Sequence, residues 1–152
     1  MIEVWGKGWD NLSNLPRSWQ ARLDECRHTF CGPCDDKRPV LSKYVFALAF
    51  ENTRVPGYVT EKVVDAMIAG CVPVYRGAPD IADHVPAGAI LDLSRYGKTA
   101  EAVDRIRLMS DADVLATVSA GREFLMSRAG DRHSFEGFAE RVISLVRGGA
   151  AE

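Results

Sequence analysis

The sequence predicts an α/β domain with a parallel β-sheet that is covered by helices on both faces. One observation is a continuous apolar segment, YVFALAF at residues 44–50, which is typical of a strand buried on both faces, as in parallel sheets. A second is that the segments after it alternate between helix-like and strand-like patterns. Right-handed crossover connections in such a sheet produce this order.

The composition is that of one folded domain. The chain has 152 residues, of which 47% are hydrophobic and 26% are charged, enough to bury a core without disulfides or a metal. Nineteen basic and twenty-one acidic residues give a net charge of −2, which argues against a nucleic-acid-binding protein. We expect a single domain over residues 1–147 and a frayed tail over residues 148–152.

The sequence carries no clear targeting segment. No apolar run approaches the ~18 residues that span a bilayer, and the first residues lack the charged-then-apolar order of a signal peptide. We expect a cytoplasmic location for the isolated chain, and peripheral contact with a membrane through a partner stays open.

The first forty residues have weak patterns. IEVW at residues 2–5 predicts a short strand, and residues 16–28 have weak helical character. The glycine, proline and aspartate content of residues 31–39 predicts a loop.

The central third alternates between strands and a helix. After the strand at residues 44–50, the pattern predicts a helix with Thr60 at its N-cap and Gly70 as its stop signal. Two further strands are predicted, CVPVY at residues 71–75 and AILDL at residues 89–93.

The last third is predicted to be helical. Residues 99–109, 111–130 and 134–146 are amphipathic segments with apolar residues at helical spacing. In the third segment we interpret Phe135 and Phe138 as core residues rather than as contacts to a cofactor.

Three of the four cysteines lie close together in CRHTFCGPC. Cys26, Cys31 and Cys34, with His28 between them, have a composition that can bind zinc. Only one C-x-x-C pair is present and no second half-site follows, so we prefer plain thiols in a loop and predict no metal. We interpret Cys71 as an ordinary buried thiol.

A polar cluster lies between the strand at residues 44–50 and the central helix. In an open parallel sheet, ligands bind at this position, the carboxyl ends of the strands. The amides of residues 60–62 and the ammonium group of Lys62 favour a phosphate, and Glu61 can accept hydrogen bonds from ribose hydroxyls. We therefore predict a site for a nucleoside diphosphate with its sugar. The predicted site residues are Glu51, Asn52, Tyr58, Thr60, Glu61, Lys62, Arg76 and Gly77.

A simpler interpretation of this cluster stays open. Thr60 and Glu61 can cap the helix while Lys62 is solvated, with no ligand involved. No G-x-G-x-x-G and no Walker loop is present, which disfavours ordinary dinucleotide-binding and P-loop proteins. The histidines are scattered, so the sequence predicts no Ser/His/Asp set.

Four motifs follow one another at specific separations. They are KYVFALAFEN (43–52), YVTEK (58–62), AGCVPVYRGAPD (69–80) and HVPAGAILDL (84–93). Together they resemble the carboxy-terminal donor domain of the family 10 α-1,3/1,4-fucosyltransferases over roughly the central 50 residues. The resemblance implies a Rossmann-like domain, equivalent to the C-terminal half of a GT-B glycosyltransferase. It also implies GDP-fucose as the donor substrate for inverting transfer of fucose to a glycan hydroxyl, typically on an N-acetylglucosamine-containing acceptor.

The resemblance implies roles for the site residues. Lys62 would contact the diphosphate and stabilise the leaving group as a catalytic residue, and Glu61 would contact the ribose. Tyr58 would contact the nucleotide, and Asn52 would lie near the phosphates or the fucose. The family's general base is a carboxylate in an amino-terminal acceptor domain, which would act here in cis or in trans. No cofactor is required, and a divalent metal is not indicated.

The sequence also departs from the family pattern. Where the family often has P-x-x-S-F-I, residues 86–90 read PAGAI, without the serine and the aromatic residue. The alternatives are therefore a GT-B transferase domain for another nucleotide sugar and a non-catalytic nucleotide-binding remnant.

Overall fold

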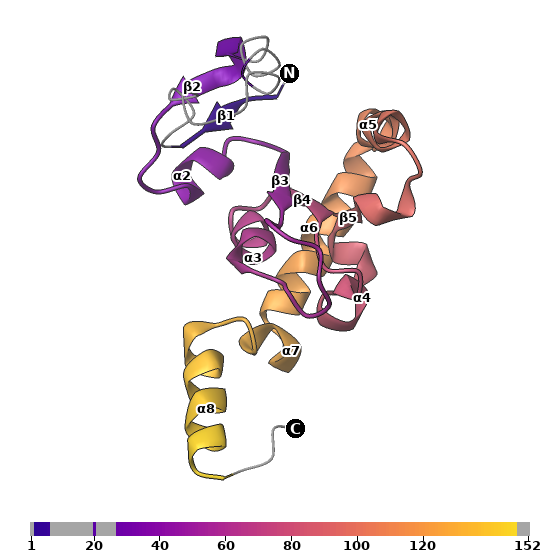
Figure 1. Ribbon diagram of the computed structural model, residues 1–152. Coiled ribbons are helices and arrows are strands. Elements are labelled where there is room, and N and C mark those ends of the chain that lie inside the picture. Colours follow the sequence, from indigo (N-terminus) through magenta and orange to yellow (C-terminus); the bar gives the residue numbers. More distant parts are fainter. Residues whose placement is uncertain (1, 7–19, 21–26, 149–152) are drawn as a thin grey trace. The chain divides into compact units, whose positions relative to one another are not determined.

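The computed structural model describes residues 2–6, 20 and 27–148. The chain divides into two compact units, Met1–Val40 and Leu41–Glu152, and all the predicted site residues belong to the second (Figure 1). The weak helix predicted over residues 16–28 falls almost entirely outside the described residues. The extent of the domain, residues 1–147, stays a prediction.

The first unit contains a small parallel sheet. Strand β1 (Val4–Trp5) pairs with strand β2 (Phe30–Gly32), a 3₁₀ turn (Arg27–Thr29) precedes β2, and helix α2 (Arg38–Leu41) begins just before the second unit. The strand predicted at residues 2–5 is confirmed for its last two residues, Val4–Trp5. The loop predicted for residues 31–39 is wrong at both ends, because β2 and α2 are too short to produce a periodic pattern.

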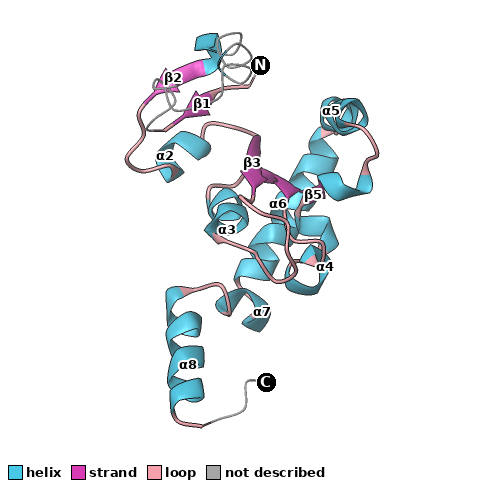
Figure 2. Cartoon of the chain, in the orientation of Figure 1, coloured by secondary structure: helices cyan, strands magenta, loops and turns pink. Residues whose placement is uncertain are grey.

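A three-stranded parallel sheet organises the second unit. Its strands are β3 (Phe46–Phe50), β4 (Val72–Arg76) and β5 (Leu91–Asp92), in the order β3-β4-β5 (labelled in Figure 1; strands are magenta in Figure 2). Parallel neighbours need a crossover connection. Helix α3 (Glu61–Ile68) lies in the connection from β3 to β4, and helix α4 (Ile81–His84) in that from β4 to β5. The predicted α/β fold with a parallel sheet is confirmed.

The last third of the chain is helical, as predicted. Its elements are two 3₁₀ turns at Ala87–Ala89 and Leu93–Arg95, and helices α5 (Thr99–Leu108), α6 (Asp111–Leu125), α7 (Arg128–Asp131) and α8 (Phe135–Val146). Among the described helices, none combines the length and the hydrophobicity needed to span a membrane.

Helix α3 covers one face of the three-stranded sheet. Successive side chains of a strand point to opposite faces. Ala49 of β3 and Tyr75 of β4 therefore share a face, and they form one hydrophobic cluster with Val63 and Met67 of α3 and Phe124 of α6. All five of these residues are at most 7% exposed. Because the side chain of Ala49 is small, α3 can lie directly on β3.

The opposite face is only partly covered. Val72 and Val74 of β4 pack against Ile106 of α5 and against the first half of α6, which places helices on both faces as predicted. On the β3 side of this face, however, Leu48 is 54% exposed and Phe50 is 39% exposed. The prediction that this strand is buried on both faces is therefore wrong for its outer face.

Both ends of α3 follow from local sequence. Thr60 occupies the N-cap, as predicted, although its side chain makes no capping hydrogen bond. Gly70, with a φ of 80°, ends the helix, because few other residues adopt this left-handed conformation. The amide of Gly70 donates to Met67 O (3.0 Å) and that of Cys71 to Ala66 O (2.9 Å), which is a Schellman motif. The thiol of Cys71 is buried, as interpreted from the sequence.

The helix predicted over residues 111–130 is interrupted near its end. It begins with a capping box in which Ser110 and Asp113 exchange hydrogen bonds. The interruption arises at Ser127, which starts the next helix by accepting a hydrogen bond from the amide of Gly130 (3.2 Å). A serine within an amphipathic pattern therefore acts as a cap here.

Helix α8 has an apolar face but no buried residue. Phe135 is 82% exposed and Phe138 is 58% exposed, so their interpretation as core residues is wrong. Helical spacing of apolar residues indicates an amphipathic helix, but it does not indicate what covers the apolar face.

The two phenylalanines Phe124 and Phe138 provide a test of this packing. Phe124→Ala should lower the free energy of unfolding by about 3–5 kcal/mol, because it leaves a cavity beside α3. Phe138→Ala, the matched control on α8, should change it by about 0.5 kcal/mol or less, since the side chain is exposed. Urea denaturation followed by circular dichroism measures both. Equal losses would show that α8 is packed in solution.

Candidate functional site

The candidate site lies at the carboxyl edge of β3 and β4. Phe50 and Arg76, the last residues of the two strands, are aligned in register. The amide of Glu51 donates to Arg76 O (2.9 Å), so the pairing extends one residue beyond β3. The loop of residues 51–60 and the turn that begins with Gly77 therefore leave the sheet side by side, as the sequence predicts.

The carboxylate of Glu51 lies at the centre of this edge, and its side chain is 0% exposed. Oε1 accepts a hydrogen bond from the amide of Thr60 (2.8 Å). Oε2 accepts from the hydroxyl of Thr60 (2.7 Å) and from the ammonium group of Lys62 (3.0 Å). The amide of Thr60, expected from the sequence to be unpaired, is therefore occupied by Glu51.

The ammonium group of Lys62 lies between the protein and solvent. Nζ donates to Glu51 Oε2 (3.0 Å) and to Thr60 Oγ1 (3.2 Å), and the side chain is 29% exposed. An ammonium group has three N–H bonds. These two contacts within the described residues leave one N–H bond for an oxygen atom of a ligand.

Four other predicted site residues lie at the surface. Asn52 and Glu61 are exposed, and Tyr58 is 37% exposed. Arg76 is exposed as well, but it alternates with Tyr75 along β4, so its side chain leaves the strand on the face opposite to α3. These side chains are accessible, and their contact with a ligand stays a prediction.

Gly77 is buried against the same carboxylate. A Cβ atom at this position would collide with the hydroxyl of Tyr75 and with Cγ of Glu51. The Tyr75 side chain is 0% exposed, and its hydroxyl accepts a hydrogen bond from the amide of Ala78 (2.9 Å). Burial raises the pKa of Tyr75. The glycine therefore makes room for two buried side chains.

Asp80 joins the two loops of the site, although no sequence pattern pointed to it. Both of its carboxylate oxygens accept from the amide of Gly57 at 2.9 Å. This hydrogen bond lowers the pKa of Asp80. His84 Nε2 lies 3.5 Å from the same carboxylate. The two residues joined are 23 positions apart, which explains why local motifs do not reveal the contact.

The described part of the cysteine segment shows no metal site. Among the described residues, no three His, Cys, Asp or Glu side chains are grouped so that they could hold a metal ion. Cys31 donates to a carboxylate oxygen of Glu3 (3.5 Å), and Cys34 donates to Asp36 O (3.0 Å). Cys26 lies outside the described residues, so the interpretation of the three cysteines as plain thiols stays a prediction.

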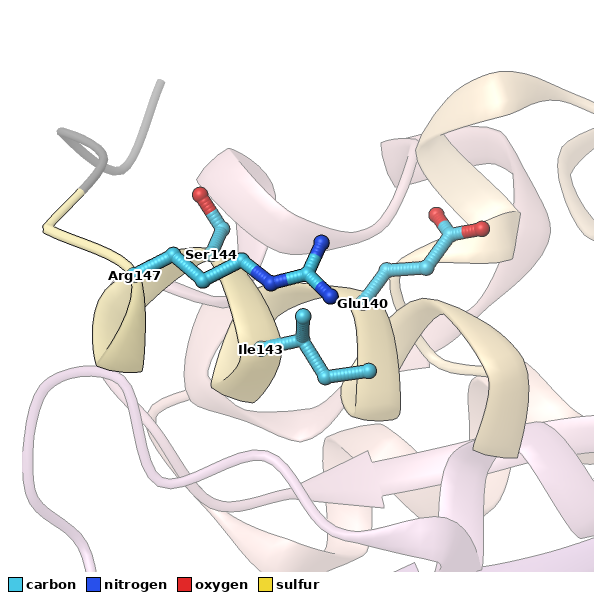
Figure 3. A pocket seen from close by; sticks show the side chains of 4 residues that line it. All are labelled: Glu140, Ile143, Ser144 and Arg147. Atoms are coloured by element: carbon cyan, nitrogen blue, oxygen red, sulfur yellow. The ribbon is translucent and has the colours of Figure 1, made fainter.

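A surface hollow of 540 Å³ lies along α8 (Figure 3). It is lined by Glu140, Ile143, Ser144 and Arg147, all from α8 or the residue after it. In Figure 3 the side chain of Arg147 extends above Ile143 in the direction of Glu140. The hollow contains none of the predicted site residues, and the surface of one helix does not enclose a ligand.

A family model matches most of the chain. The model described as Glycosyltransferase family 10 (fucosyltransferase) C-term matches residues 9–116. This range contains the three-stranded sheet, helix α3 and every predicted site residue.

Curated relatives match about half of the chain. An α-(1,4)-fucosyltransferase of Arabidopsis thaliana is 40% identical over 49% of this chain and 18% of its own length. The α-(1,3)-fucosyltransferase FucT of Helicobacter pylori is 35% identical over 55% of this chain and 17% of its own length. GDP-fucose protein O-fucosyltransferase 3 of Bos taurus is 41% identical over 49% of this chain and 16% of its own length. The matched part is therefore less than a fifth of each relative.

Solved structures agree in fold. A crystal structure of an α1,3-fucosyltransferase with GDP has a TM-score of 0.56 and 31% identity over 58% of this chain and 26% of that chain. A second crystal structure, of an α1,3-fucosyltransferase with GDP-fucose, has a TM-score of 0.58 and 23% identity over 77% of this chain and 38% of that chain. These similarities confirm the predicted fold, a Rossmann-like half of a GT-B protein.

The hydrogen bond between Asp80 and Gly57 can be tested directly. Asp80→Ala removes both acceptor oxygens, so the amide of Gly57 should exchange with solvent faster in hydrogen-exchange NMR. Asp83→Ala removes an exposed carboxylate on α4, the helix that Asp80 directly precedes; it is the matched control and should leave this rate unchanged. An unchanged rate in Asp80→Ala would mean that the contact does not persist in solution.

The same residue predicts a pH dependence of stability. Because the pKa of Asp80 is lowered in the folded chain, its contribution to stability is present above the ordinary value of 3.8. This contribution is lost as the pH falls through the lowered pKa. The Asp80→Ala variant should therefore lose less stability than the unchanged chain when denaturation curves are compared in this acidic range.

Proposed function

Because this chain belongs to glycosyltransferase family 10 (fucosyltransferase), whose C-terminal domain it matches, we propose that it is a donor-binding domain for GDP-fucose. The observation that carries this proposal is the position of Lys62. Its ammonium group is fixed at the start of α3 and at the carboxyl edge of the sheet, where its two contacts leave a third N–H bond for a ligand oxygen. Relatives named for GDP-fucose, and a similar solved structure with bound GDP, support the choice of nucleotide.

We propose that Lys62 and the first turn of α3 bind the diphosphate. The positive end of the helix dipole lies there, and the side chain of Thr60 does not cap it. The exposed carboxylate of Glu61 is proposed to accept hydrogen bonds from the ribose. Tyr58 and Asn52, both on the exposed loop, are proposed to contact the nucleotide and the phosphates or fucose. Arg76, whose side chain leaves β4 on the face opposite to α3, stays a second proposed phosphate contact from the neighbouring strand.

The proposed reaction is inverting transfer of fucose. An acceptor hydroxyl attacks the anomeric carbon, the bond from this carbon to the phosphate oxygen breaks, and GDP leaves with the bonding electron pair. Lys62 stabilises the negative charge that develops on the leaving oxygen. The proton of the acceptor hydroxyl passes to a general base, which we place outside this chain.

The acceptor is proposed to be a glycan hydroxyl, typically on an N-acetylglucosamine-containing glycan. The α-(1,3)- and α-(1,4)-fucosyltransferase names of the relatives support transfer to a glycan. Relatives named protein O-fucosyltransferase make a protein hydroxyl the second acceptor class. The acceptor contacts and the base are proposed to come from an acceptor domain in cis or in trans, because the matched part is 16% to 18% of these relatives.

The nucleotide can be tested with a panel of ligands. In a thermal-shift assay, GDP and GDP-fucose should raise the melting temperature, and UDP, ADP and their sugars should raise it less. A larger shift with another nucleotide would favour a GT-B domain for a different sugar. A folded chain that is stabilised by none of them would contradict the proposed function.

The role of Lys62 can be tested by substitution. Lys62→Ala should weaken GDP binding by about 10- to 100-fold, the effect expected for a lost hydrogen bond from a charged group. Lys98→Ala, at an exposed lysine before α5, is the matched control and should leave the Kd unchanged. Isothermal titration calorimetry measures both. Because Lys62→Ala also removes the ion-pair partner of Glu51, the titration is made well below the melting temperature of the variant.

A further inference from the structure

We propose that Glu51 is a positioning residue, which holds the ammonium group of Lys62 in place for the diphosphate and does not contact the donor itself. This inference rests on the proposed function of Lys62. It assigns Glu51, predicted from the sequence to bind the donor, an indirect role that follows from its contacts.

The first argument is the burial of Glu51. Its side chain is 0% exposed, and its oxygens accept from three donor groups, the amide and hydroxyl of Thr60 and the ammonium group of Lys62, at 2.7–3.0 Å. A buried carboxylate is stable only when it is paired and hydrogen-bonded, so these contacts are required in the absence of any ligand. The carboxylate therefore has no exposed surface that could contact the nucleotide-sugar substrate.

The second argument is the freedom that Lys62 would otherwise have. A solvated lysine side chain occupies many rotamers and loses them when it binds a phosphate. In this chain the Lys62 ammonium group is already held by two acceptors, Glu51 Oε2 and Thr60 Oγ1. The entropic cost of ordering the side chain on binding is therefore reduced, which favours affinity through preorganisation.

The negative charge of Glu51 opposes this benefit. A carboxylate next to Lys62 partly cancels the positive charge that attracts a phosphate. The Lys62 side chain, however, is 29% exposed and keeps a third N–H bond, whereas the side chain of Glu51 is 0% exposed. A ligand at that N–H bond is therefore closer to the ammonium group than to the carboxylate. We infer that positioning outweighs repulsion, and the sign of the effect is measurable.

Gly77 supports the same arrangement from the neighbouring strand. A Cβ atom at Gly77 would collide with Cγ of Glu51 and with the hydroxyl of Tyr75. Both side chains are buried and hydrogen-bonded, so an alanine at this position forces Glu51, Tyr75 or both to shift. Gly77→Ala thus disturbs the packing around the carboxylate without changing any charge.

The experiment is a double-mutant cycle on the full chain, with GDP and guanosine as ligands in calorimetry. Glu51→Gln keeps the shape of the side chain and removes its charge. It should weaken GDP binding by about 2- to 10-fold, as expected when a side chain is no longer held in place before binding. The Kd for guanosine, which has no phosphate, should not change. In the Lys62→Ala background, Glu51→Gln should have no further effect on GDP, because it acts through Lys62.

Each alternative outcome has a distinct meaning. Equal weakening of GDP and guanosine would show a general structural role, and tighter GDP binding would show that repulsion dominates; either result overturns the inference. An undiminished effect of Glu51→Gln in the Lys62→Ala background would show direct contact with the donor and overturns it as well. If the unchanged folded chain binds no GDP, the proposed function fails first, and the inference fails with it.

Gly77→Ala is the second variant, in case Glu51→Gln does not fold. It should weaken GDP binding more than guanosine binding, in the same direction as Glu51→Gln. Gly97→Ala, at an exposed position before α5 where a Cβ atom would make only ordinary contact, is a control for glycine replacement and should leave GDP binding unchanged. NMR relaxation of the Lys62 side chain without ligand should show greater mobility in both Glu51→Gln and Gly77→Ala. An unchanged mobility would contradict positioning.

Discussion

The geometry of the carboxyl edge of β3 and β4 depends on the hydrogen bonds and the ion pair of one buried carboxylate, that of Glu51. An ionised side chain that is withdrawn from water has to be fully hydrogen-bonded and paired with a positive charge. Its donors come from Thr60 and Lys62, nine and eleven residues further along the chain. The pairing therefore fixes where the loop after β3 ends and where α3 begins. Gly77, with no side chain, completes the arrangement by leaving the necessary space.

The hydrophobic core places this edge, and the polar network then refines it. Ala49 and Tyr75 bring α3 onto the sheet through Val63 and Met67, which sets the axis of the helix. Hydrophobic contacts are not directional, so they do not decide the position of a single ammonium group. Hydrogen bonds do, because they require specific distances and angles. The site is thus a directional network supported by a close-packed helix and sheet.

The sequence predicted well what depends on local patterns and poorly what depends on distant partners. The three strands, the N-cap at Thr60 and the stop at Gly70 follow from apolar runs and backbone preferences, and the structure confirms them. The exposure of Phe135 and Leu48 did not follow, because periodicity identifies an apolar face but not its cover. The contacts of Glu51 and Asp80 join residues that are separated in the sequence and that the fold brings together. The spacing of residues along the sequence therefore does not predict these contacts.

The two interpretations of the cluster at the start of α3, a helix cap and a ligand site, are reconciled by these contacts. Thr60 does occupy the cap position, but its hydroxyl hydrogen-bonds to Glu51 and Lys62, and its side chain makes no capping hydrogen bond to α3. Lys62 neutralises Glu51, so the pair has no net charge, whereas a diphosphate carries more than one negative charge. The positive end of α3 supplies only about half a charge. Tight binding of GDP-fucose would therefore need further positively charged side chains. The candidates are Arg76 and residues that lie beyond the carboxyl edge of β3 and β4.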